Sequence, residues 1–267
     1  MSENSVKGSE LYKKLPEFAA MRSAELQRSL QPVVALIDAY GKLVSRVVVA
    51  LGSSKPESRQ ASIVRDLIAD VFDFLYEWRR PLFEGRAHVA FPLGRRAYES
   101  LSLLSVCCQD EAFALRWDSG SQIGNREIRE ALATLPVSEE KDGLQELYKL
   151  FSKGAHPNRE LVGERHLGDD NEYVLGSIAV PELVLVVDQS ITMVDLWFWF
   201  GALTGHVAKD ALAKSDPGFG HDYLEVAANA KDVKTWLVAS FNNLLELRQA
   251  EMREELKRRS KSGDRGA

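Results

Sequence analysis

The feature of this sequence that most limits its fold is the spacing of its apolar residues, which recur every three or four positions along most of the chain. Ile63, Leu67 and Val71 show this pattern clearly. Side chains at such intervals share one face of an α-helix, whereas a half-buried strand would alternate apolar and polar residues. No run of that alternating kind stands out. The sequence therefore predicts an all-α, multi-helix bundle with essentially no sheet.

Proline and glycine divide the apolar pattern into segments, as expected at helix ends. The expected helices are Leu11–Leu30, Val33–Leu51, Ser62–Trp78, His88–Cys108 (regular from Arg95 onward, after Pro92 and Gly94), Asp110–Trp117, Asn125–Leu135, Glu139–His156, Pro181–Lys209 and Val226–Arg259. We expect residues 11–259 to form a single helical domain. Residues 1–10 are expected to be a flexible N-terminus, and residues 260–267 a disordered tail.

The composition of the 267-residue chain is that of a globular protein, with 45% hydrophobic and 27% charged residues. Its net charge of -5 provides no general attraction to nucleic acid or anionic lipid, so such binding would need a local basic patch. The two cysteines, Cys107 and Cys108, are adjacent and lack nearby residues at zinc-ligand spacing. These features favour a reducing, cytoplasmic location, and no metal or other cofactor is expected.

The apolar stretch from Ile178 to Val207 is long enough to raise the question of a membrane. Glu182, Asp188 and Asp195 interrupt it, and an acidic residue at a bilayer centre costs on the order of 3 kcal/mol. We therefore expect a buried helix and no membrane span. The four consecutive aromatic residues from Trp197 to Phe200 encircle such a helix, which predicts either full burial or an interface, including one in a homodimer.

Two polar motifs could carry chemistry. Arg95 and Glu99 are four residues apart, as are Tyr148, Ser152 and His156, so each set shares one helix face. One interpretation is structural: a surface ion pair is worth roughly 0.3–0.5 kcal/mol, and a histidine near a helix end often only caps carbonyls. The other is functional. If the two helices pack together, a cation, a carboxylate and an imidazole form one network, which could bind phosphate and move a proton.

This pair of motifs resembles that of a bacterial all-helical family of unknown function, which carries Arg-x-x-x-Glu on one helix and Tyr-x-x-x-Ser-x-x-x-His on a later one. The resemblance extends from Phe91 to Leu161, and it implies the fold and the location of the site. The chain also resembles, more distantly, the HEPN ribonucleases, whose motif is an Arg, four to six residues and then a His near a helix start. Here Arg159 and His166 have six residues between them. That second resemblance implies RNA cleavage without a metal ion.

Two functional hypotheses follow. In the first, the protein cleaves RNA or binds phosphate without a metal: His156 is the general acid or base, Arg95 holds the phosphate and Glu99 orients Arg95, while Ser152 and Tyr148 position the substrate or His156. A local cluster of basic residues could bind a phosphate backbone and so supports it, although the alternative is that these are only scattered arginines at helix ends: Arg79, Arg80, Arg86, Arg95 and Arg96. In the second, the protein is a non-catalytic helical module that binds a protein partner or self-associates. The sequence leaves open whether the protein is an enzyme.

Overall fold

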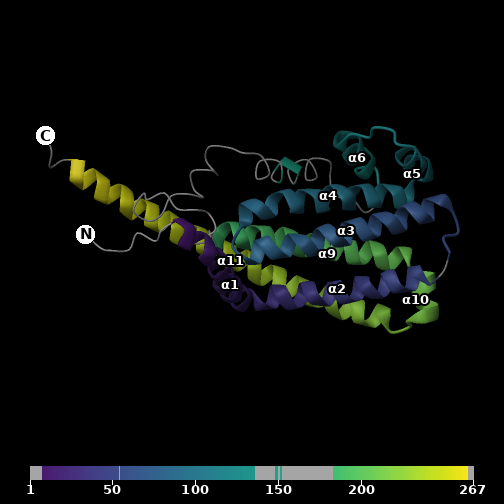
Figure 1. Ribbon diagram of the computed structural model, residues 1–267, viewed down its shortest axis with the longest axis horizontal. Helices are drawn as coiled ribbons and strands as arrows, with labels where there is room; N and C mark the ends of the chain where they lie inside the picture. The colour runs from purple at the N-terminus through teal and green to yellow at the C-terminus, as the bar shows by residue number, and fades with distance from the viewer. Residues whose placement is uncertain (1–7, 54, 136–147, 150, 152–182, 264–267) are drawn as a thin grey trace.

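The computed structural model describes residues 8–53, 55–135, 148–149, 151 and 183–263 (Figure 1). Within these ranges the chain forms helices and no strand, which confirms the all-α fold. The helices are α1 (Gly8–Ser29), α2 (Gln31–Gly52), α3 (Arg59–Phe83), α4 (Ala87–Gln109), α5 (Glu111–Asp118), α6 (Asn125–Leu132), α9 (Leu183–Val207), α10 (Lys209–Ser215) and α11 (Phe219–Gly263).

The helix α9 lies at the centre of the bundle. It packs against α2, α3, α4 and α11, which run along the long axis of the molecule (Figure 1). Trp197 and Phe200 are completely buried, whereas Phe198 keeps 44% of its surface exposed. A helix that is apolar on most sides is stable only when neighbours cover it. The aromatic run is therefore largely core, and Phe198 is its most exposed member.

Polar residues of α9 have partners in the neighbouring helices. Gln189 donates to the Ala87 carbonyl at 3.0 Å and accepts from the Trp78 indole at 3.2 Å. The Asp195 carboxylate binds Lys234 of α11 at 2.7 Å. Among the described residues, α9 alone is long and apolar enough to cross a membrane, and half of its most apolar window is buried inside the bundle. Burial of that kind is what the central helix of a bundle requires.

Local signals set several of the helix boundaries. The Ser58 hydroxyl accepts from the Ala61 amide at the start of α3, and the Asp110 carboxylate accepts from the Phe113 amide at the start of α5. Gly85, with φ of 71°, supplies the left-handed residue between α3 and α4. These caps satisfy amides that have no partner inside the helix.

Several boundaries differ from those expected. The range of α4 is close to the expected His88–Cys108, but its regular helix begins at Ala87 rather than Arg95 and contains Pro92, while α3 continues through Pro81. A proline inside a helix costs about 3 kcal/mol, but Ala90 and Phe91, directly before Pro92, are buried and favour the continuous helix. The chain also forms the unexpected α10, and α11 starts at Phe219 rather than Val226. At its other end α11 continues to Gly263, beyond the expected end at Arg259.

Candidate functional site

The predicted pairing of Arg95 with Glu99 is present on α4. Arg95 Nε donates to Glu99 Oε1 at 2.8 Å, and Arg95 Nη2 donates to the Tyr148 hydroxyl, also at 2.8 Å. Both charged side chains are largely shielded, with 22% and 15% exposed. The hydrogen bond to Glu99 raises the pKa of the Arg95 guanidinium, so this group is always charged. Arg95 thus connects α4 to a residue that lies much later in the chain.

The carboxylate of Glu99 also connects α4 to α6. Its Oε1 atom accepts a second hydrogen bond from Asn125 Nδ2 at 2.8 Å. Asn125 is the first residue of α6, directly after its N-cap Gly124. One oxygen therefore receives a donor from each of two helices. This arrangement holds the start of α6 beside the motif on α4.

A second arginine completes the cluster. The Arg129 guanidinium carbon lies 4.1 Å from the centre of the Tyr148 ring, and that of Arg95 lies 5.0 Å from the same centre. Arginine stacks favourably on aromatic faces because the ring's negative face attracts the cation. Arg129 Nη1 is buried and forms no hydrogen bond within the described part of the protein. The cluster of Arg95, Glu99, Tyr148 and Arg129 therefore has a net charge of +1 and one unused donor.

Beneath the cluster, close packing fixes the position of the Tyr148 segment. A Cβ atom on Gly94 would lie 2.6 Å from the Trp78 ring and 2.7 Å from the Phe151 ring. The Phe151 ring in turn packs edge-on against Trp78 at 5.8 Å and stacks on Tyr98 at 6.0 Å. The missing side chain at position 94 thus allows Phe151, three residues after Tyr148, to lie against α3 and α4.

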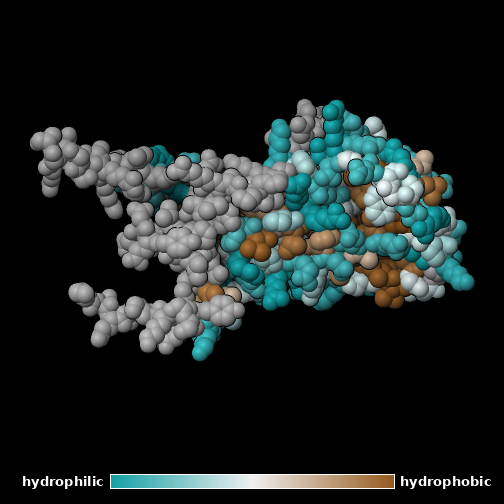
Figure 2. All heavy atoms as spheres, turned by 45° about the horizontal axis from the view of Figure 1, so that its top comes forward, coloured by the Kyte–Doolittle hydropathy of each residue, from teal (hydrophilic) through white to brown (hydrophobic). Residues whose placement is uncertain are grey.

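A cleft of about 350 Å³, lined by both polar and apolar residues, adjoins the cluster. Glu99 belongs to both, its partner Asn125 also lines the cleft, and Asp66, Asp70 and Arg96 contribute the other charged groups of the cleft. Ser100 donates to Asp70 Oδ2 at 2.7 Å. With three carboxylates and one arginine the cleft is acidic, so it disfavours an anion. In Figure 2 the face over α4, α5 and α6 is mainly hydrophilic, interrupted by separate hydrophobic groups.

The structure brings together three of the five predicted site residues, namely Arg95, Glu99 and Tyr148. Ser152 and His156 lie outside the described residues, as does the segment with Arg159 and His166. The sequence analysis missed Asn125 and Arg129. Their spacing of four residues on α6 was the available signal, because it places both on one helix face.

The predicted basic cluster is largely neutralised. Its arginines pair with carboxylates as follows: Arg79 with Asp38 at 2.6 Å, Arg80 with Glu84 at 3.2 Å, Arg86 with Glu84, Arg95 with Glu99 at 2.8 Å, and Arg96 with Asp70 at 3.9 Å. A surface of paired charges attracts a phosphate backbone weakly. The basic cluster is therefore not the open patch that nucleic-acid binding requires.

Metal and thiol chemistry find little support in the described part of the chain. No group of three or more His, Cys, Asp or Glu residues there could hold a metal ion. Burial raises the pKa of the Cys107 and Cys108 thiols to about 12. Both thiols therefore stay protonated at neutral pH, whereas the thiolate is the nucleophilic form.

Comparisons with protein-family models, with curated proteins and with solved structures found no match to this chain.

Proposed function

We propose that the protein binds a phosphate group of RNA beside Tyr148, and that it cleaves the RNA without a metal ion. The observation that carries the proposal is the stacking of two guanidinium groups, Arg95 and Arg129, on the ring of Tyr148. Glu99 balances only one of the two positive charges. The unused Arg129 Nη1 donor supports the binding of an acceptor such as a phosphate oxygen.

The acidic cleft limits where the phosphate can lie. Asp66 and Asp70 would repel an anion inside the cleft, so the phosphate belongs on the Tyr148 side of Glu99. In this proposal Glu99 orients Arg95, as the 2.8 Å hydrogen bond between them supports. Tyr148 provides the surface on which both arginines rest, and Ser152 positions the substrate or His156.

The reaction in this proposal needs no co-reactant. The ribose 2′-hydroxyl attacks the adjacent phosphorus, and its proton passes to a base. The bond to the 5′-oxygen breaks as that oxygen takes up a proton, which leaves a 2′,3′-cyclic phosphate and a free 5′-hydroxyl. His156 accepts or supplies one of these protons, because imidazole changes charge near neutral pH.

Incubation of the full chain with fluorescent single-stranded RNA in EDTA tests the cleavage step. We expect cyclic-phosphate products on a denaturing gel, and their loss in His156→Ala without loss of RNA binding. An inactive wild-type protein, or a fully active His156→Ala variant, would contradict the proposed reaction.

A second candidate function is self-association through α11. Leu244 is the last described residue of α11 that packs against the core, yet the helix continues to Gly263. Leu247, three residues after Leu244, is 62% exposed. Leu247→Glu should shift any dimer to monomer in sedimentation velocity, whereas Leu224→Glu, at an equally exposed site near the start of α11, should not. A monomeric wild-type protein at high concentration would exclude this candidate.

A further inference from the structure

A second pocket, of about 380 Å³, lies between the C-terminal half of α9, the short α10 and the start of α11. In Figure 1, α10 and the start of α11 lie at the lower edge of the bundle, whereas α5 and α6 lie at its upper edge. None of the residues of the Arg95 cluster lines this pocket. Its volume is within the roughly 300–1,000 Å³ of ligand-binding pockets. The pocket is therefore separate from the proposed RNA site.

The wall of the pocket is made of small and aromatic residues. A Cβ atom on Gly201 would lie 3.1 Å from the Tyr40 ring and 3.4 Å from the Tyr223 ring, and one on Gly205 would lie 3.2 Å from the Phe219 ring. The glycines thus let aromatic rings approach the backbone of α9. Phe219 and Tyr223 stack with ring centres 6.4 Å apart. Such a surface suits an apolar, compact ligand body.

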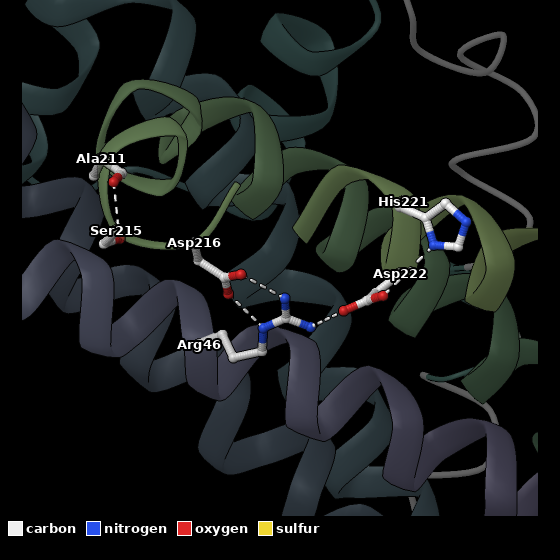
Figure 3. A network of polar contacts seen from close by, with 6 residues as sticks. All are labelled: Arg46, Ala211, Ser215, Asp216, His221 and Asp222. Carbon is white, nitrogen blue, oxygen red and sulfur yellow. Dashed lines mark hydrogen bonds and ion pairs between the residues drawn. The ribbon is translucent and has the colours of Figure 1, made fainter. Parts of the chain in front are cut away.

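An ion-pair network holds the α10–α11 side of the pocket in place (Figure 3). Arg46 of α2 donates to both oxygens of Asp216, at 2.6 and 2.8 Å, and to Asp222 Oδ2 at 2.6 Å. Its guanidinium also lies 5.4 Å from the centre of the Phe219 ring. Arg46 therefore fixes the pocket wall from α2 and binds both carboxylate oxygens of Asp216, the only acidic residue of the lining.

Two basic residues, His206 and Lys209, lie at the exposed edge of the pocket. Within the described part of the chain, Lys209 forms no ion pair. An unpaired ammonium beside an apolar, aromatic wall complements a ligand that has an anionic head and an apolar body. Asp216 already pairs with Arg46, so it attracts a cationic head less than a free carboxylate would.

We propose that this pocket binds an apolar carboxylic acid of the size of a medium-chain fatty acid. The acyl chain lies against Gly201, Gly205 and Phe219, and the carboxylate lies beside Lys209. The proposal is independent of the RNA site, because the two share no residue.

The probe for this pocket is decanoate, measured by its displacement of anilinonaphthalene sulfonate from the folded full-length protein. Decyltrimethylammonium, which has the same chain length and the opposite charge, serves as the matched ligand control. We expect saturable displacement by decanoate and at least tenfold weaker displacement by the cation.

Two variants test the position of the ligand. Lys209→Gln should weaken decanoate binding about two- to fivefold, as for an exposed ion pair, whereas Lys214→Gln on the same helix should leave it unchanged. Ala213→Leu places a larger side chain at the exposed lining position 213 and should abolish binding while the melting temperature stays within about 2 °C. The proposal would be overturned if decanoate and decyltrimethylammonium bound equally well, if decanoate showed no saturable binding, or if Ala213→Leu bound decanoate as well as the wild type.

Discussion

Arg95 Nη2 donates a 2.8 Å hydrogen bond to the hydroxyl of Tyr148, 53 residues further along the chain. The same guanidinium binds Glu99 through Nε. Because both contacts come from one partly buried cation, removal of any of the three groups takes a hydrogen bond from another. The network therefore couples α4 to the Tyr148 segment whether or not it also binds a ligand.

Tyr148→Phe should lower the free energy of unfolding by about 1 kcal/mol, since it removes one hydrogen bond and keeps the ring beneath Arg129. Arg95→Gln should cost more, because Glu99 loses its positive partner. In urea denaturation the double variant should be more stable than the sum of the single effects predicts, by about 0.5–1 kcal/mol. Strict additivity would show that the two groups act independently. The same test applied to Arg95→Ala and His156→Ala measures whether His156 belongs to the network.

Gly94→Ala should destabilise the protein by about 1–3 kcal/mol, because its methyl group would overlap the rings of Trp78 and Phe151. Gly41→Ala is the matched control within α2, where no atom lies within 4 Å of the added Cβ. That change should stabilise the protein by about 0.4–1 kcal/mol, since alanine favours the helix. Thermal unfolding measures both, and a neutral Gly94→Ala would contradict the packing described here.

The aromatic run of α9 contains both a buried and an exposed side chain, Trp197 and Phe198. Trp197→Ala should cost about 3–5 kcal/mol, because this side chain is fully buried, while Phe198→Ala should cost less than about 1.5 kcal/mol. Denaturant unfolding gives both values. Dissociation of an oligomer by Trp197→Ala, without loss of protomer stability, would instead place Trp197 at an interface.

The ion pairs of Arg46 should make stability depend on pH in the acid range. The hydrogen bond from Arg46 lowers the pKa of Asp216 below its ordinary value of 3.8. The carboxylate therefore stabilises the fold above that value, and this contribution is lost as the pH falls through the lower, folded-state pKa. The melting temperatures of wild type and Asp216→Asn should differ most near pH 6 and converge toward pH 2. A constant difference would exclude the linkage.

Much of the fold could be predicted because burial of apolar side chains at helical spacing depends on local sequence. Ile63, Leu67 and Val71 all lie in the core, as their spacing indicates. The range of α4 was predicted to within one residue at each end, but its regular part was placed too late, at Arg95, because Pro92 is a strong local helix breaker. The burial of Ala90 and Phe91 favours the continuous helix. The local sequence pattern alone does not show how much this burial stabilises the helix.

The candidate site was predictable only in part, for a similar reason. Spacing of four residues placed Arg95 and Glu99 on one face, and it placed Tyr148 in a later motif that could form a network with them if the two segments packed together. Tyr148 is that partner for Arg95. The approach of Arg129 and Asn125 depends on how α6 folds back on α4, and the adjoining acidic cleft depends on α3. Neither arrangement follows from the spacing of residues within one helix.

The central claim is that Arg129 binds phosphate, and the fluorescence anisotropy of labelled single-stranded RNA tests it most directly. Arg126→Gln is the matched control, because Arg126 lies on the same helix and is 85% exposed. Arg129→Lys, which keeps the positive charge, is the second variant in case Arg129→Gln disturbs the fold. We predict that Arg129→Gln weakens RNA binding about tenfold or more, Arg129→Lys weakens it less, and Arg126→Gln changes it less than about twofold. Equal affinities for Arg129→Gln and wild type, with both proteins folded, would contradict the account.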